Sequence, residues 1–293
     1  MFENIKFIIP VCDSTLHIMK LSSYLYDKFY DFDLEIILLG FKKPEFELSS
    51  KFRFVSMAKE QVGGSNSWSK YIRSFLESID DKYVFFLLED YLPTCSPNIE
   101  MMNMITKMMQ DSSSSIGRFD ITFDSFIANN GTTMLKFPNY DLLEIEKGRE
   151  YRITTQPSLW NKDYLIEILK HTTSPWSFEI QGSRYSSNLK ESVYAIGDHT
   201  FMNYPSRWVH KGAISRHYKN KINLLGLDTK TIKEVVELEL VNEKDIVWGM
   251  WSGGGVPSFE EMGGYSFDPR RMPLHPSSRT RWKEYYSVYG VHE

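Results

Sequence analysis

The chain has 293 residues, of which 42% are hydrophobic and 25% charged, a composition typical of a folded globular protein. Its formal net charge of −4 disfavours bulk electrostatic capture of nucleic acid. The two cysteines, Cys12 and Cys95, form neither a disulfide framework nor a metal finger, so we expect reduced thiols in a cytoplasmic protein. No apolar stretch has the length of a signal peptide core or a membrane span, and peripheral membrane association stays open.

Short apolar segments alternate with amphipathic ones in the first half of the chain. Strands are predicted at residues 5–10, 34–39, 52–55 and 83–88. Apolar residues at helical spacing predict helices over residues 18–29 and 68–79, with residues 13–15 offering N-cap chemistry for the first. This alternation favours an α/β fold with a mostly parallel, Rossmann-like sheet flanked by helices. Ligands of such sheets bind beyond the carboxyl ends of the strands, here at residues 10–13 and 89–91.

The second half of the chain has a more mixed pattern. Helices are predicted at residues 99–109, 161–171 and 229–241, and strands at residues 118–123, 151–155, 193–196 and 207–209. We expect one compact domain whose two halves span residues 1–125 and 126–250, followed by a basic, aromatic tail at residues 251–293. The oligomeric state stays open.

Glu89 and Asp90 are the sharpest chemical signal in the sequence. A very hydrophobic strand runs directly into these adjacent carboxylates. Burying carboxylates at a strand end is costly unless a cation or a hydrogen-bond donor pairs with them. Mg²⁺ and Mn²⁺ accept such oxygen ligands and bridge them to phosphates, which suits the departure of a nucleoside diphosphate. The alternative interpretation is an acidic turn on the surface.

The order of these motifs resembles the GT-A glycosyltransferases, in particular the family-2-like bacterial and viral members. The resemblance implies transfer of a sugar from a UDP- or GDP-linked donor to an acceptor hydroxyl, with Mn²⁺ or Mg²⁺ as cofactor. It makes residues 1–125 the nucleotide-sugar-binding half and residues 126–250 the acceptor-side half. It places the donor on the loop after the first strand, at Pro10, Val11 and Asp13, with Asn66 near the start of a later helix.

The resemblance also assigns Glu89 and Asp90 to the metal and the diphosphate. Tyr91 stands where many members have another acid, which leaves the need for a metal open. By order in the chain, His210 would complete the metal shell and Lys211 would lie near the donor diphosphate.

On the acceptor side, the resemblance makes Glu179 the catalytic base, and it makes Trp160 and Trp176 contacts of the acceptor. A base must reach the acceptor hydroxyl to remove its proton. The alternative is a plain helix start, with Ser174 as cap and Pro175 at the first helical position, in which Glu179 is a solvated residue.

Two other functions stay open. A sugar-phosphate nucleotidyltransferase is disfavoured because residues 11–15 lack a glycine-rich basic loop. A non-catalytic nucleotide-sugar or carbohydrate-binding protein of the same fold is favoured by Tyr91 in place of an acid. The acceptor, which could be a carbohydrate, a lipid-linked sugar, a protein or a nucleic acid, is not determined by the sequence, nor is the choice between inversion and retention.

Overall fold

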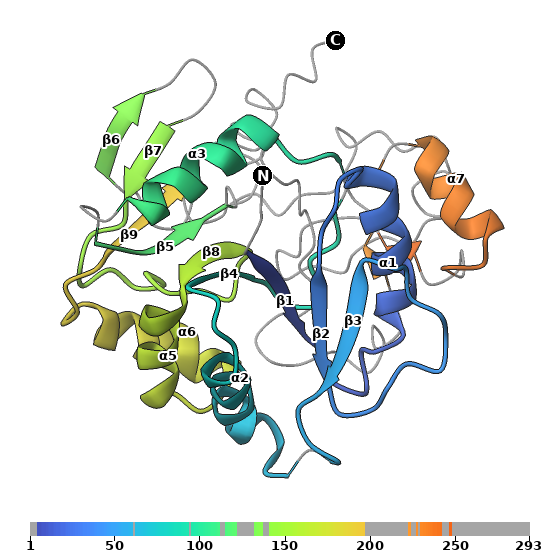
Figure 1. Cartoon of the computed structure of the whole chain (residues 1–293), viewed down its shortest axis with the longest axis horizontal. Coiled ribbons are helices and arrows are strands. Elements are labelled where there is room, and N and C mark those ends of the chain that lie inside the picture. The colour runs from blue at the N-terminus through green and yellow to red at the C-terminus, as the bar shows by residue number, and fades with distance from the viewer. Residues whose placement is uncertain are drawn as a thin grey trace.

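The computed structural model describes residues 5–60, 62–93, 95–111, 115–121, 132–136, 141–196, 222–223, 227, 229–241 and 246–247. Within these ranges one nine-stranded mixed sheet has the order β3-β2-β1-β4-β8-β5-β9-β7-β6 (Figure 1). A separate two-stranded sheet pairs β10 (Ile222–Asn223) with β11 (Ile246–Val247). The α/β class predicted from the sequence is therefore confirmed.

The four strands of the first half are parallel. They are β1 (Lys6–Pro10), β2 (Ile36–Gly40), β3 (Phe52–Ser56) and β4 (Tyr83–Phe86). All four lie where the sequence predicts strands. Their carboxyl ends therefore meet at one edge of the sheet, and the chain leaves β1 and β4 side by side at that edge.

The strands of the second half give the sheet its mixed character. They are β5 (Ile116–Asp120), β6 (Thr132–Lys136), β7 (Asp141–Glu144), β8 (Ser158–Asn161) and β9 (Ser192–Ile196). β8 lies between β4 and β5 and is antiparallel to both, whereas β5 and β9 are parallel. β7 is antiparallel to both β9 and β6. The sheet is thus parallel in its first half and mixed beyond β4.

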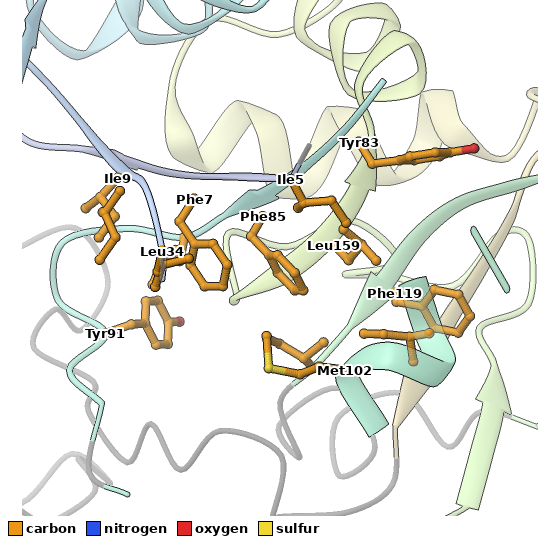
Figure 2. Packing of buried hydrophobic residues seen from close by; sticks show 14 of the residues in the cluster. Ile5, Phe7, Ile9, Leu34, Tyr83, Phe85, Tyr91, Met102, Phe119 and Leu159 are labelled. Atoms are coloured by element: carbon orange, nitrogen blue, oxygen red, sulfur yellow. The ribbon is translucent and has the colours of Figure 1, made fainter. Parts of the chain in front are cut away.

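Helices cover both faces of the sheet (Figure 1). α1 (Ile18–Phe29) and α3 (Ile99–Gln110) bury Met19, Tyr26 and Met102 against one face, which Phe7 and Phe85 also line (Figure 2). α2 (Trp68–Glu77), α5 (Lys162–Lys170) and α6 (Pro175–Ser186) cover the opposite face. Because successive strand residues point to opposite faces, a strand covered on both sides must be apolar throughout, as β2 and β4 are.

The caps of two helices match the sequence. The side chain of Asn161 accepts hydrogen bonds from the backbone N–H groups of Asp163 and Tyr164 at the start of α5. Ser174 accepts one from Ser177 at the start of α6, with Pro175 at its first position. Serine and asparagine satisfy the open N–H groups of a first turn in this way.

α7 (Thr229–Glu237) packs on the outer side of α1 (Figure 1). Ile232 and Val235 are buried in a small cluster with Leu21 and Leu25 of α1. Across the described residues, no helix combines the length and the apolar composition that crossing a membrane requires.

Two local predictions are wrong. Residues 13–15 do not cap α1, since its N-cap is His17 with no side-chain cap bond. Residues 151–155 form no strand but a buried loop that begins at Tyr151 with φ of 55°. In this loop the backbone N–H groups of Ile153 and Thr155 donate to the side chains of Ser183 and Glu179, so they do not pair with a neighbouring strand. The strand forms later, at β8.

Gly117 on β5 gives a test of the packing between β5 and α5. A Cβ atom there would lie 2.5–2.7 Å from the ring of Tyr164. That ring cannot easily retreat, because its hydroxyl accepts a hydrogen bond from buried Arg152 at 3.0 Å. We expect Gly117→Ala to lower the free energy of unfolding by about 1–3 kcal/mol through overpacking. Urea unfolding followed by tryptophan fluorescence measures this loss. Ser115→Ala, at an exposed position, is the control, and an equal midpoint for both variants would contradict the packing described.

Candidate functional site

The loops after β1 and β4 leave the sheet next to each other. The backbone N–H of Val11 donates to Leu39 O at 2.8 Å, and that of Leu87 donates to Ile8 O at 3.2 Å. These bonds extend the sheet pairing one residue past each strand. The chain then turns at residues 11–15 on one side and at residues 87–90 on the other.

Thr15 and Glu89 join these two loops directly. The hydroxyl of Thr15 donates to Glu89 Oε1 at 2.5 Å. The same hydroxyl lies 3.2 Å from Cys12 O and 3.0 Å from Cys12 Sγ. The sequence prediction that residues 10–13 and Glu89 share one edge of the sheet is consistent with this bond. Thr15 itself was missed, because a threonine before a helix has the pattern of a cap.

The carboxylate of Glu89 is desolvated although the residue keeps some exposed surface. Burial raises the pKa of Glu89, and hydrogen bonds from Thr15 and from a backbone N–H oppose that shift. No described cation contributes to its electrostatics. A divalent cation would offset the cost of desolvating this group.

Glu89 and Asp90 are the two carboxylates of this turn that could hold a cation shared with phosphate. Asp90 follows Glu89 in the same turn and is also half-buried. Mg²⁺ commonly binds through one or two carboxylates while substrate phosphates and water fill its other positions. Within the described ranges no three Asp, Glu, His or Cys side chains converge on one point, so the described residues contribute Glu89 and Asp90 there as a pair. His210 and Lys211 lie outside the described residues.

Tyr91 is a core residue and not a third ligand of the acidic turn. Its side chain is buried in the core cluster that α1 and α3 cover, which also contains Phe7 and Leu34 (Figure 2). An aromatic core residue therefore takes the position at which many GT-A members have another acid.

The other predicted donor residues differ in exposure. Pro10 and Val11 have buried side chains, so only their backbone borders the edge. Asp13 is exposed, and its Oδ1 accepts a hydrogen bond from the backbone N–H of Lys42 at 3.2 Å, which ties the β1 loop to the loop after β2. Asn66 is exposed in η1 (Gly64–Ser67), and no described hydrogen bond links it to the other predicted donor residues.

The start of α6 lies beside the carboxyl end of β4. The ring of Phe178 is 5.6 Å from that of Trp68, which is 6.0 Å from that of Phe86, the last residue of β4. Glu179 follows Phe178 and is half-buried, and its carboxylate accepts hydrogen bonds from Thr155. The capped helix start predicted as the alternative is present, yet Glu179 is not a freely solvated residue.

The two tryptophans predicted to contact an acceptor have opposite environments. Trp176 exposes 46% of its surface in the first turn of α6. Trp160 is fully buried on β8, packed against Tyr164 and Phe178, with the Arg118 guanidinium 5.1 Å from its ring. Trp160 therefore has no face open to an acceptor, which corrects that prediction. Successive side chains of a strand point to opposite faces, and the side chain of Trp160 points to the face that α5 and α6 cover.

A buried ion pair beside these residues was missed by the sequence analysis. Arg118 and Asp120 are two residues apart on β5, so both point to the same face, and their side chains meet at 2.8 Å. Arg118 also donates to Ser158 Oγ at 3.0 Å and Arg152 O at 3.1 Å. Burial lowers the pKa of Arg118, while the negative charges of Asp120 and Glu179 raise it. The sequence signal for this pair was an arginine and an aspartate two residues apart in a predicted strand, which places both side chains on one face.

Comparison with known proteins gives no family for this chain. No family model matches it, and no curated protein matches it. A crystal structure of residues 1–349 of S. aureus TarS aligns with 13% identity and a TM-score of 0.40, covering 68% of this chain and 60% of that one. A second S. aureus TarS structure aligns with the same identity and TM-score, covering 65% of this chain and 36% of that one. The chain thus spans less than two thirds of either structure, and likeness at this level assigns neither family nor activity.

The buried pair on β5 can be tested by a double-mutant cycle. Arg118→Met alone should lower the free energy of unfolding by about 3–5 kcal/mol, because it leaves the Asp120 carboxylate buried without its guanidinium. The same change in an Asp120→Asn background should cost about 2 kcal/mol less, since no charge is then stranded. Urea unfolding of the four proteins measures the coupling. Strictly additive costs would show that the pair contributes nothing as a pair.

Proposed function

We propose that the protein is a glycosyltransferase that uses a UDP- or GDP-linked sugar donor. The hydrogen bond between Thr15 and Glu89 is the observation that supports this most. It joins the loop after β1 to the acidic turn after β4, at the edge of a parallel sheet where ligands of α/β folds bind. A cation bridged to a diphosphate would offset the cost of desolvating the carboxylate of Glu89 at this edge.

The donor would lie along this edge. Glu89 and Asp90 would hold Mn²⁺ or Mg²⁺, with His210 as a further ligand and Lys211 near the diphosphate. Asp13 would lie near the nucleoside, because it is the exposed carboxylate of the β1 loop. A bound metal would neutralise the negative charge that develops on the leaving phosphate oxygen.

The acceptor would lie at the start of α6. Glu179 is the proposed base, and Trp176 offers an exposed indole on the same part of the helix. The apolar face of a pyranose packs on such a ring, which favours a carbohydrate acceptor, free or lipid-linked, over a protein or a nucleic acid. The net charge of −4 further disfavours nucleic acid.

A second candidate is a nucleotide-sugar-binding protein without catalysis. The burial of Tyr91 in the core favours it, because the third position of the acidic turn then supplies no ligand. Titration with UDP-glucose and GDP-mannose, with and without Mn²⁺, separates the two functions when product release is measured in the same samples. Metal-dependent binding without release of UDP or GDP would favour the binding protein.

Asp90→Ala tests the acidic turn. We expect release of UDP or GDP from these donors to fall by about a hundredfold or more, because the variant removes a proposed metal ligand. Asp31→Ala removes the same charge from an exposed position between α1 and β2, at the other end of the sheet, and should keep full turnover. Circular dichroism and thermal unfolding show whether both variants fold. Normal turnover by a folded Asp90→Ala protein would rule out the metal role.

Thr15 gives a test that does not need turnover. Thr15→Val keeps the shape of the side chain but removes the hydroxyl that donates to Glu89. We expect the affinity for Mn²⁺ in the presence of UDP to fall by about tenfold, as it does when an outer partner of a metal ligand is lost. Isothermal titration calorimetry measures the change. Thr15→Ser keeps the donor and should bind Mn²⁺ like the wild type, whereas equal affinities for Thr15→Val and Thr15→Ser would contradict the assignment.

A further inference from the structure

The carboxylate of Glu179 is held through one of its two oxygens. The backbone N–H of Thr155 donates to Oε1 at 3.0 Å, and the Thr155 hydroxyl donates to the same atom at 2.8 Å. In the described part of the chain no donor reaches Oε2. Two donors on one oxygen fix the orientation of a carboxylate and leave its other oxygen for an exchangeable partner.

The residue that holds Glu179 lies in a loop that is anchored to β5. Thr155 is buried in the loop between β7 and β8. Its neighbour Thr154 accepts a hydrogen bond from Arg118, whose guanidinium is bound to Asp120 and lies near the charge of Glu179. The donors that meet Oε1 therefore stand on a loop anchored to β5 and do not depend on an exposed, movable side chain.

We infer that Thr155 is a positioning residue for the base, holding Oε1 so that Oε2 faces the acceptor. The inference rests on the proposed glycosyl transfer and deepens it. In an inverting transfer, the acceptor hydroxyl proton passes to Oε2 while the hydroxyl oxygen bonds to the anomeric carbon. The bond between that carbon and the phosphate oxygen breaks, and its electron pair leaves with the nucleoside diphosphate. Orienting one carboxylate oxygen affects this step and not the binding of the donor.

A neighbouring contact supplies a matched structural control. Ser183 on α6 accepts a hydrogen bond from the backbone N–H of Ile153 at 2.9 Å. It joins the same loop to the same helix and is also buried. Its hydroxyl donates to the backbone carbonyl of Glu179 but makes no hydrogen bond with the carboxylate. A variant at Ser183 therefore loosens the contact between loop and helix but keeps both Thr155 donors to the Glu179 carboxylate.

The experiment compares Thr155→Val, Thr155→Ser and Ser183→Ala in the full chain. Hydrolysis of UDP-glucose and GDP-mannose with Mn²⁺, in which water takes the place of the acceptor, gives kcat and KM. We expect Thr155→Val to lower kcat about tenfold with KM for the donor unchanged, because one charge-assisted hydrogen bond is lost. Thr155→Ser should restore kcat, and Ser183→Ala should lower the thermal midpoint but not kcat. Equal kcat values for Thr155→Val and Ser183→Ala would overturn the inference.

Residue-resolved amide hydrogen exchange tests the clamp without turnover. Glu179→Ala should speed exchange of the Thr155 amide by about tenfold or more, and Ser183→Ala should do the same for the Ile153 amide. Unchanged exchange at Thr155 in Glu179→Ala would also overturn the inference. Absence of hydrolysis by the wild type would count against the proposed function alone, since the exchange measurement would still decide whether Thr155 holds Glu179.

Discussion

The hydrogen bond from Thr15 to Glu89 connects residues 74 apart in the sequence, and the candidate site depends on it. It forms because β1 and β4 are parallel neighbours, so the segments that follow them emerge at the same edge. The bond partly offsets the desolvation of the Glu89 carboxylate, which has this hydroxyl and a backbone N–H as donors and no described cation. The proposal of a cation with a diphosphate at this edge rests on this desolvated carboxylate, because a cation would offset its desolvation cost.

A second set of polar contacts lies inside the protein beside α6, where we propose that the acceptor binds. Arg118 and Asp120 pair where β5 meets β8, and Arg118 binds the loop that contains Thr154 and Thr155. That loop in turn holds Glu179. A buried ion pair adds little net stability, because desolvation offsets most of its attraction. Its role here is geometric, since Arg118 donates hydrogen bonds to Arg152 O and Thr154 of the irregular segment beside α6.

Sequence patterns were sufficient for most of the fold and for part of the site. The apolar strands and the capped helices α5 and α6 follow from rules that act over a few residues, and the structure confirms them. The acidic turn after β4 was predicted because adjacent carboxylates directly after a buried strand are unusual. The strand predicted at residues 151–155 was wrong, because its backbone donors bind side chains of α6 that are remote in the sequence. Trp160 was misassigned because its type suits a sugar site, whereas its place on β8 directs it into the core.

The sequence by itself determined that this chain forms an α/β sheet with two carboxylates after its most apolar strand. Hydrophobic periodicity and turn chemistry encode these features locally. Only the tertiary structure decided which groups meet: Thr15 with Glu89, Thr155 with Glu179, and Arg118 with Asp120 inside the core. These contacts depend on strand order and on the face to which each side chain points. Neither is set by neighbouring residues, because both arise when segments remote in the chain pack against one another.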